Sequence, residues 1–247
     1  MSADTTSVGG NRILNALPAS ERLRVSTLTE AVTFSAETVL FEPGTTIDAV
    51  YFPTDGVISL ATPLRDGAYI EVATVGNEGI VGVPLVPPAG SSVRAISRVA
   101  GCGHWMDAGV FLESCRRSHA FQTLVDRYTQ ALFCQISQTA ACNRFHVSEE
   151  RLSRWLLMHH DRIHSDHLTI TQASLGQMLG TRRSTISVSA GGLQRAGLIR
   201  FARGHVTIID RQGLEALSCE CYSIIKTEFN RSARRDSCSQ IGARPLL

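Results

Sequence analysis

The spacing of apolar residues changes period along the chain. Residues 12–28 have apolar side chains at helical spacing with a break at Pro18, which predicts two short helices. Residues 32–112 consist of short runs rich in Val, Ile, Phe and Thr, separated by turn signals such as Asp66-Gly67. Several short strands at this spacing are typical of an antiparallel sandwich or barrel, so we predict an N-terminal β domain.

A long helical stripe follows the β region, from Phe121 to Cys142. Apolar residues recur there at steps of three and four, as expected for a helix with one buried face. The stripe includes Phe121, Leu124, Val125, Tyr128, Leu132 and Ile136. It could pack on the β domain, or it could form a dimer interface between two copies of the chain. Because the helix is long and links two regions, we predict the dimer interface.

The rest of the chain alternates helical patterns with short strands. It predicts an amphipathic helix over 148–163, a strand over 167–170, helices over 172–179 and 183–196, a hairpin over 198–210 and a final helix over 212–229. The polar segments 1–11 and 230–247 are expected to be disordered or loose. The chain is therefore expected to have an α+β fold with a separate C-terminal domain.

The segment 171–193 has the spacing of a helix-turn-helix. Gly176 is small where a second helix must cross closely, and Gly180 stands where the first helix ends in a left-handed residue. Ile186, six residues later, returns an apolar side chain to the core shared with Leu175. The following hairpin would form a wing.

Charge is unevenly distributed in a chain whose net charge is only +2. Residues 1–100 have a net charge of −4, whereas residues 167–209 contain five Arg and no Asp or Glu. In a helix-turn-helix the second helix enters the major groove, and an arginine fork matches guanine O6 and N7. The predicted DNA-contacting residues are Thr171, Gln172, Arg182, Arg183, Ser184, Thr185, Ser187, Val188, Arg200 and Arg203.

Other functional classes find no support in the sequence. There is neither an apolar run long enough to span a membrane nor a secretory signal, so a cytoplasmic location is expected. We find no catalytic motif and predict that the chain is not an enzyme. The seven Cys form no CxxC pair, and Cys219 and Cys221, placed in one helix, would not face each other. The histidines within 159–167 are interpreted as a solvated helix end, so no metal site is assigned.

The chain resembles the Crp/Fnr family of bacterial transcription regulators. The resemblance lies in the segments "VLFEPGTTIDAVYFPTDGVISL" and "ITQASLGQMLGTRRSTIS" and in the long helix between them. The resemblance implies a cyclic-nucleotide-type β-roll, a dimerising linker helix and a C-terminal winged helix-turn-helix. It places these domains at 12–117, 118–146 and 147–229. It also implies a homodimer on a near-palindromic operator, with RNA polymerase as a further partner.

Residue by residue, the resemblance gives a partial match. Arg183 and Ser184 match base-reading positions of the recognition helix, and Thr171 and Gln172 match phosphate positions. Val188 stands where well-known members have a second base-reading arginine, which implies a non-standard operator.

The effector cassette of the family is altered in this chain. Gly82 aligns with the motif glycine, but Val83 replaces the glutamate that binds the ribose, and Glu78 is out of register. Arg94-Ala95 is either the remnant of the phosphate-binding arginine or an ordinary surface strand. This argues against cyclic AMP and leaves the effector open between a cyclic nucleotide and another small molecule. The alternative function is a ligand, haem or redox sensor whose DNA binding is weak or vestigial.

Overall fold

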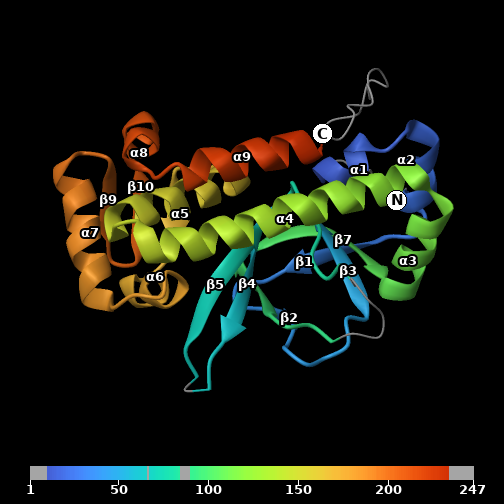
Figure 1. Cartoon of the computed structure of the whole chain (residues 1–247), viewed down its shortest axis with the longest axis horizontal. Helices are drawn as coiled ribbons and strands as arrows, with labels where there is room; N and C mark the ends of the chain where they lie inside the picture. The colour runs from blue at the N-terminus through green and yellow to red at the C-terminus, as the bar shows by residue number, and fades with distance from the viewer. Residues whose placement is uncertain (1–9, 66, 84–89, 234–247) are drawn as a thin grey trace, which may run out of the picture.

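The computed structural model describes residues 10–65, 67–83 and 90–233 (Figure 1). Most of the predicted disordered start and loose tail lies outside these residues. The predicted boundaries of these two segments are wrong at Asn11 and at Asn230. Asn11 is buried, and its side chain caps the first helix while donating hydrogen bonds to Pro53 O and Gly79 O, both at 2.9 Å. The last helix continues through Asn230 to Ser232.

Two antiparallel sheets form the predicted β domain, which confirms the α+β class. Its strands are β1 (Glu30–Phe34), β2 (Val39–Phe41), β3 (Ala49–Pro53), β4 (Val57–Pro63), β5 (Tyr69–Val75), β6 (Arg94–Val99) and β7 (Gly101–Asp107). The strand orders are β1-β7-β3 and β2-β6-β4-β5. Inward side chains such as Phe52, Ile58 and Ala95 are almost completely buried between the sheets, because alternate residues of a strand point to the same face.

Helices close one end and one side of this roll. They are α1 (Arg12–Ala16), α2 (Ala19–Ser26), α3 (Ala108–Arg117) and the long α4 (His119–Phe145). Figure 1 shows α4 running across the roll toward the C-terminal domain. Phe111 of α3 and Phe121 of α4 pack edge to face with ring centroids 5.5 Å apart, and both lie near Phe52. These aromatic contacts fix the start of α4 on the roll.

The buried stripe of α4 faces its own chain. Phe121, Leu124, Val125 and Tyr128 are at most 6% exposed, and the Tyr128 hydroxyl donates a hydrogen bond to Ile80 O at 2.7 Å. The prediction that these four residues form a dimer interface is therefore wrong, because side chains already buried within one protomer cannot contact another. The alternative interpretation, packing on the β domain, is correct for this half of the stripe.

The predicted final helix is in fact two helices. α8 (Arg211–Leu217) ends at Ser218, whose backbone is extended, and α9 (Cys221–Ser232) then folds back along α4 in the opposite direction (Figure 1). The Phe229 ring lies 6.2 Å from the Tyr128 ring. Because Cys219 precedes α9 and Cys221 begins it, the argument that two positions in one helix cannot face each other does not apply.

Helix α5 (Ser148–Ile163) lies between the roll and the C-terminal domain and is buried on nearly all sides. Arg151, Arg154 and Arg162 are all less than 8% exposed, and His159 is 1% exposed. The predicted solvated end is thus wrong at His159, which stacks on Trp155 with centroids 3.5 Å apart. Helical periodicity identifies the apolar face but cannot show that other elements also cover the polar face.

The C-terminal domain is a winged helix-turn-helix, as predicted. Its elements are β8 (His167–Thr169), α6 (Gln172–Met178), α7 (Arg183–Arg195), β9 (Ile199–Ala202) and β10 (His205–Ile208), with α8 behind them. The three strands form one antiparallel sheet in the order β8-β10-β9. Among the described residues, no helix combines the length and the apolar composition needed to cross a membrane.

Candidate nucleic-acid interface and ligand cavity

The turn between α6 and α7 has the geometry that its glycines predict. Gly180 has a φ of +58°, a left-handed conformation that glycine adopts without strain. A Cβ on Gly176 would lie 2.9 Å from Thr181 O, so a larger residue would separate the two helices. Leu175 and Ile186 are both fully buried between these helices. The turn therefore holds α7 at a fixed angle on α6.

The N-terminal end of α7 projects into solvent. Arg182, Arg183 and Ser184 are exposed, and Arg182 stands at the N-cap position without a capping hydrogen bond from its side chain. None of the ion pairs among the described residues involves Arg182 or Arg183. Two cations beside the positive end of a helix dipole, without acidic partners, create a surface that attracts anions.

The other predicted contact residues of α7 differ in exposure. Ser187 is exposed and Val188 is 69% exposed, whereas Thr185 is partly buried. An exposed valine at this position offers a methyl contact but no hydrogen bond to a base.

The start of α6 lies beside the wing. Thr171 is exposed and caps α6 by accepting a hydrogen bond from Ser174 N at 3.1 Å. The preceding Ile170 N donates to Gly204 O at 2.8 Å, which holds this helix start against the wing turn. Gln172, next in the chain, is partly buried. Their contacts with phosphate remain a prediction.

The tip of the wing is a tight turn. Arg203 and Gly204 have φ values of +50° and +81°, as in the two-residue turns that favour antiparallel hairpins. Arg203 at this tip and Arg200 on β9 are both exposed. The wing thus places two further cations on the surface of the domain.

Comparison with known proteins decides what this domain is. Residues 150–217 match the model of the Crp-like helix-turn-helix domain. Residues 150–217 therefore form a DNA-binding domain of the Crp-like helix-turn-helix type. No curated protein sequence matches it.

Solved structures show that the shared fold extends beyond this domain to most of the chain. FixK2 from Bradyrhizobium japonicum is 14% identical, with a TM-score of 0.67 over 77% of this chain and 98% of FixK2. TTHB099, a CRP-family transcriptional regulator from Thermus thermophilus, is 18% identical, with a TM-score of 0.63 over 76% and 96% of the two chains. The c-di-GMP-responsive global regulator CLP from Xanthomonas campestris is 15% identical, with a TM-score of 0.62 over 78% and 100%.

The roll of the regulator encloses a cavity of about 310 Å³ beside α4. Most of its walls are aliphatic or aromatic, and among the described lining residues none is charged. Gly82 and Val83 are part of the wall, as the sequence predicts. Gly82 has a φ of +84°, and a Cβ there would lie 2.7 Å from Ala49 O, so the fold of the roll itself requires this glycine.

The other predicted effector residues do not line this cavity. Arg94 Nε donates to Glu42 Oε2 at 2.8 Å near the surface, and Ala95 is fully buried in β6. Glu78 is buried and pairs with Arg162 of α5, with a distance of 2.7 Å between Oε1 and Nη2. Glu78, Arg94 and Ala95 therefore lie outside the roll cavity: the two charged residues are paired within the chain, and the Ala95 side chain faces the core.

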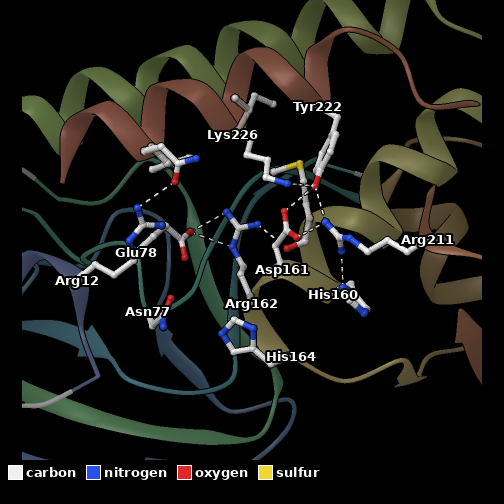
Figure 2. A pocket seen from close by; sticks show the side chains of 14 residues that line it. Arg12, Asn77, Glu78, His160, Asp161, Arg162, His164, Arg211, Tyr222 and Lys226 are labelled. Atoms are coloured by element: carbon white, nitrogen blue, oxygen red, sulfur yellow. Dashed lines mark hydrogen bonds and ion pairs between the residues drawn. The ribbon is translucent and has the colours of Figure 1, made fainter. Parts of the chain in front are cut away.

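A second cavity, of about 320 Å³, lies between α5, α9 and the start of the chain (Figure 2). Arg162 Nη2 also donates to Thr74 O at 3.1 Å, so its pairing with Glu78 joins the C-terminal domain to the roll. Nearby, Asp161 accepts from Arg211 at 2.6 Å and from Tyr222 at 2.8 Å. Sequence reasoning missed these pairings, because no local pattern joins positions 50 or more residues apart.

A buried carboxylate also links the roll to α5. Glu71 of β5 accepts a hydrogen bond from Trp155 Nε1 at 2.8 Å and one from the Ser59 hydroxyl. Burial raises the pKa of Glu71 against the opposing effect of these donors. Burial also lowers the pKa of His159 to about 3, so this imidazole is neutral in the folded protein. Contacts of this kind fix α5, and through it the DNA-binding domain, on the roll.

Proposed function

We propose that two copies of the regulator bind a near-palindromic DNA site through α7, and that a small, mainly apolar molecule in the roll cavity sets the affinity. The exposed, unpaired arginines at the start of α7 carry this proposal. They lie within a segment, residues 167–209, that contains no acidic residue. Such a surface favours phosphate contacts, while the arginine forks offer base recognition. Bound at a promoter, the regulator would meet RNA polymerase.

The DNA-binding proposal is tested by selecting sites from a random duplex library with the full chain. We expect a pair of related half-sites with centres about one helical turn apart. Affinity for the selected site should fall steeply with salt concentration, because phosphate contacts release counterions. Enrichment of no sequence, or of a single asymmetric site, would contradict the proposal.

The dimer interface is proposed to be the uncovered face of α4. Phe133 is 64% exposed and Ile136 is 37% exposed, although both are large apolar side chains. The other faces of α4 pack on the roll and on α9, so this face is available to the same helix of a second protomer. Phe133→Glu should convert the dimer to a monomer in light scattering, whereas Leu23→Glu, at a 70% exposed position on α2, should leave the mass unchanged.

The cavity and the proposed dimer face share a wall. Leu132 and Ile136 of α4 both line the roll cavity, and Ile136 also reaches the uncovered face. A ligand that pushes on these side chains would therefore change how two α4 helices pack. Because the described walls have no cation to match a phosphate, an uncharged and largely apolar ligand fits the cavity better than a cyclic nucleotide does.

A further inference from the structure

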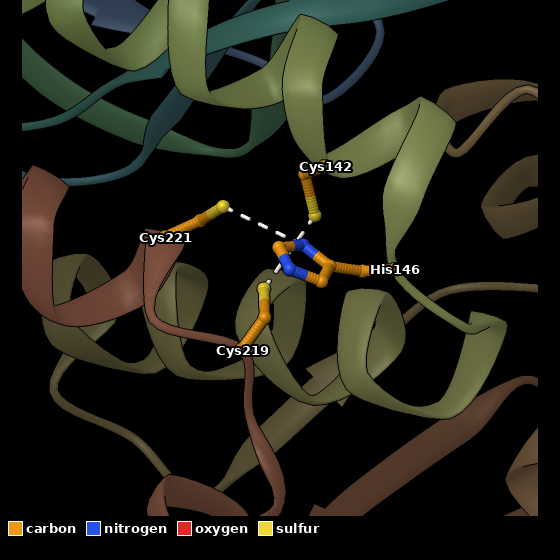
Figure 3. A group of neighbouring side chains, drawn as sticks. All are labelled: Cys142, His146, Cys219 and Cys221. Atoms are coloured by element: carbon orange, nitrogen blue, oxygen red, sulfur yellow. Dashed lines mark hydrogen bonds between the residues drawn. The ribbon is translucent and has the colours of Figure 1, made fainter.

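Four potential metal ligands meet where α4 ends and α9 begins (Figure 3). Cys142 lies in the last turn of α4, and His146, the residue that ends this helix, donates its backbone N–H to Cys142 O. Cys219 and Cys221 come from the break between α8 and α9. Their donor atoms, three sulfurs and one imidazole nitrogen, all lie within 4.8 Å of one another.

The spacing of these atoms fits a single tetrahedral ion. Zn–S bonds of about 2.3 Å and Zn–N bonds of about 2.0 Å place neighbouring donors about 3.5–3.8 Å apart. The sulfurs of Cys142 and Cys219 are 3.5 Å apart, and Cys221 Sγ lies 3.6 Å from His146 Nδ1. An iron–sulfur cluster would need a wider cage, because its ligands bind separate iron atoms. Three thiolates and one imidazole are a common ligand set of structural zinc.

The histidine is already oriented for coordination. His146 Nε2 lies 3.2 Å from Glu220 Oε2, so a proton on Nε2 is shared with this carboxylate and the lone pair of Nδ1 faces the sulfurs. A carboxylate behind a ligating histidine is the usual second partner in zinc sites. Glu220 lies between the two cysteines in sequence, so one tripeptide supplies two ligands and the support for a third.

The surroundings suit a closed site with negative charge. Cys142, Cys219 and Cys221 are at most 6% exposed. The buried guanidinium of Arg154 lies close enough to Cys142 for its positive charge to act on this thiol. The buried Arg154 Nε has no hydrogen-bond partner, and this cation would balance the single negative charge of three thiolates around a divalent ion.

We propose that Cys142, His146, Cys219 and Cys221 bind one zinc ion, which fastens α9 and the DNA-binding domain to the end of α4. The ion would join segments more than 70 residues apart in sequence and stabilise the break between α8 and α9. The site itself does not depend on the proposed dimer or effector. Any effect of the metal on DNA affinity does rest on the proposed function.

Metal content of the full chain, purified without chelators, provides the first test. We expect one zinc ion per protomer by inductively coupled plasma mass spectrometry. Replacement by Co²⁺ should produce the intense visible absorption of a tetrahedral thiolate-bound ion. A metal-free protein that takes up no Zn²⁺ or Co²⁺, or a disulfide between Cys142 and Cys219 in the isolated protein, would overturn the proposal.

Variants identify the ligands. Cys221→Ser and His146→Ala should lower metal affinity at least tenfold, and Glu220→Gln should lower it about tenfold by releasing the imidazole. Cys134→Ser is the matched control, since Cys134 is a partly buried thiol on α4 outside the cluster. Circular dichroism of each variant distinguishes loss of a ligand from loss of the fold, and the cobalt spectrum of the unaltered chain tests the site without any substitution. Equal metal binding by the control and the ligand variants would contradict the assignment.

Discussion

The surface of α7 and the cavity of the roll hold their charged residues in opposite ways. At the start of α7, Arg182 and Arg183 are exposed and make no ion pair among the described residues. Near the cavity, the charges that the sequence assigned to a ligand are already paired, Arg94 with Glu42 and Glu78 with Arg162. One region presents charge to a partner, whereas the other uses charge to hold the fold together.

The difference separates what a fold requires of its sequence from what a binding site requires. The shape of the roll depends on alternating apolar residues and on a few glycines such as Gly82, and these are present. The resemblance to the Crp/Fnr family led us to expect a glutamate and an arginine at the effector site, and Val83 stands at one of these positions. DNA recognition needs its cations exposed, so the α7 surface keeps its chemistry only if no acidic residue pairs with it.

The largest expected effect tests the paired charges. Arg162→Met should reduce the free energy of unfolding by about 3–5 kcal/mol, because it leaves the buried Glu78 without a charged partner. Urea denaturation measures this loss. The double variant Glu78→Gln with Arg162→Met should recover much of it, and Arg116→Met, at a 73% exposed side chain, should change little. A single variant as stable as the wild type would show that the pair does not hold the domains together.

The next effect tests the exposed charges. Arg183→Ala should weaken binding to the selected site by about 1–3 kcal/mol, with little effect on unrelated DNA, because a bidentate base contact is lost. Arg203→Ala should weaken both kinds of DNA equally and reduce the salt dependence by about one counterion. Filter binding over a range of salt concentrations distinguishes the two. If both variants lost affinity equally for the selected site and for unrelated DNA, Arg183 would not be a base-reading residue.

A smaller effect follows from His159, a buried base between the two regions. Burial lowers the pKa of His159 to about 3 in the folded state, whereas its ordinary pKa is about 6.5. Below about pH 6.5 the unfolded chain therefore binds a proton at this residue that the folded chain does not. Stability is therefore lost as pH falls through 6.5, by about 1.4 kcal/mol at pH 5.5 relative to pH 8. His159→Gln should flatten this dependence, and the exposed His119→Gln should not. An unchanged slope in His159→Gln would contradict the neutral buried imidazole.

The smallest expected effect concerns the cavity. Cyclic AMP should produce no heat in calorimetric titration and no change in Tm, because no described cavity residue offers a cation to its phosphate. The neutral probe N-phenyl-1-naphthylamine should bind and stabilise the protein by about 1 kcal/mol at a few times its Kd. Val83→Arg should abolish probe binding by filling the cavity. Stabilisation by cyclic AMP would contradict the prediction that the cavity takes an uncharged ligand.

The recognition unit could be predicted from sequence almost residue by residue. Gly176, Gly180 and Ile186 occupy the crossing, the turn and the core that their spacing indicated. Prediction succeeded because the contacts of a helix-turn-helix join residues of two helices that are consecutive in sequence. The backbone geometry of the turn and the crossing requires particular residue types at particular positions. The strands of the roll were equally readable, since alternation and turn residues specify them.

The sequence by itself therefore determined which segments form helices and strands, where the helix-turn-helix lies, and which cations it has. Only the tertiary structure decided what covers each face. It assigned Tyr128 to the interior of the protomer, gave Glu78 a partner 84 residues away, and brought Cys142 to Cys219 across a break that periodicity had concealed. Periodicity shows that a face is apolar but not which element covers it, because that choice depends on long-range packing that no local pattern encodes.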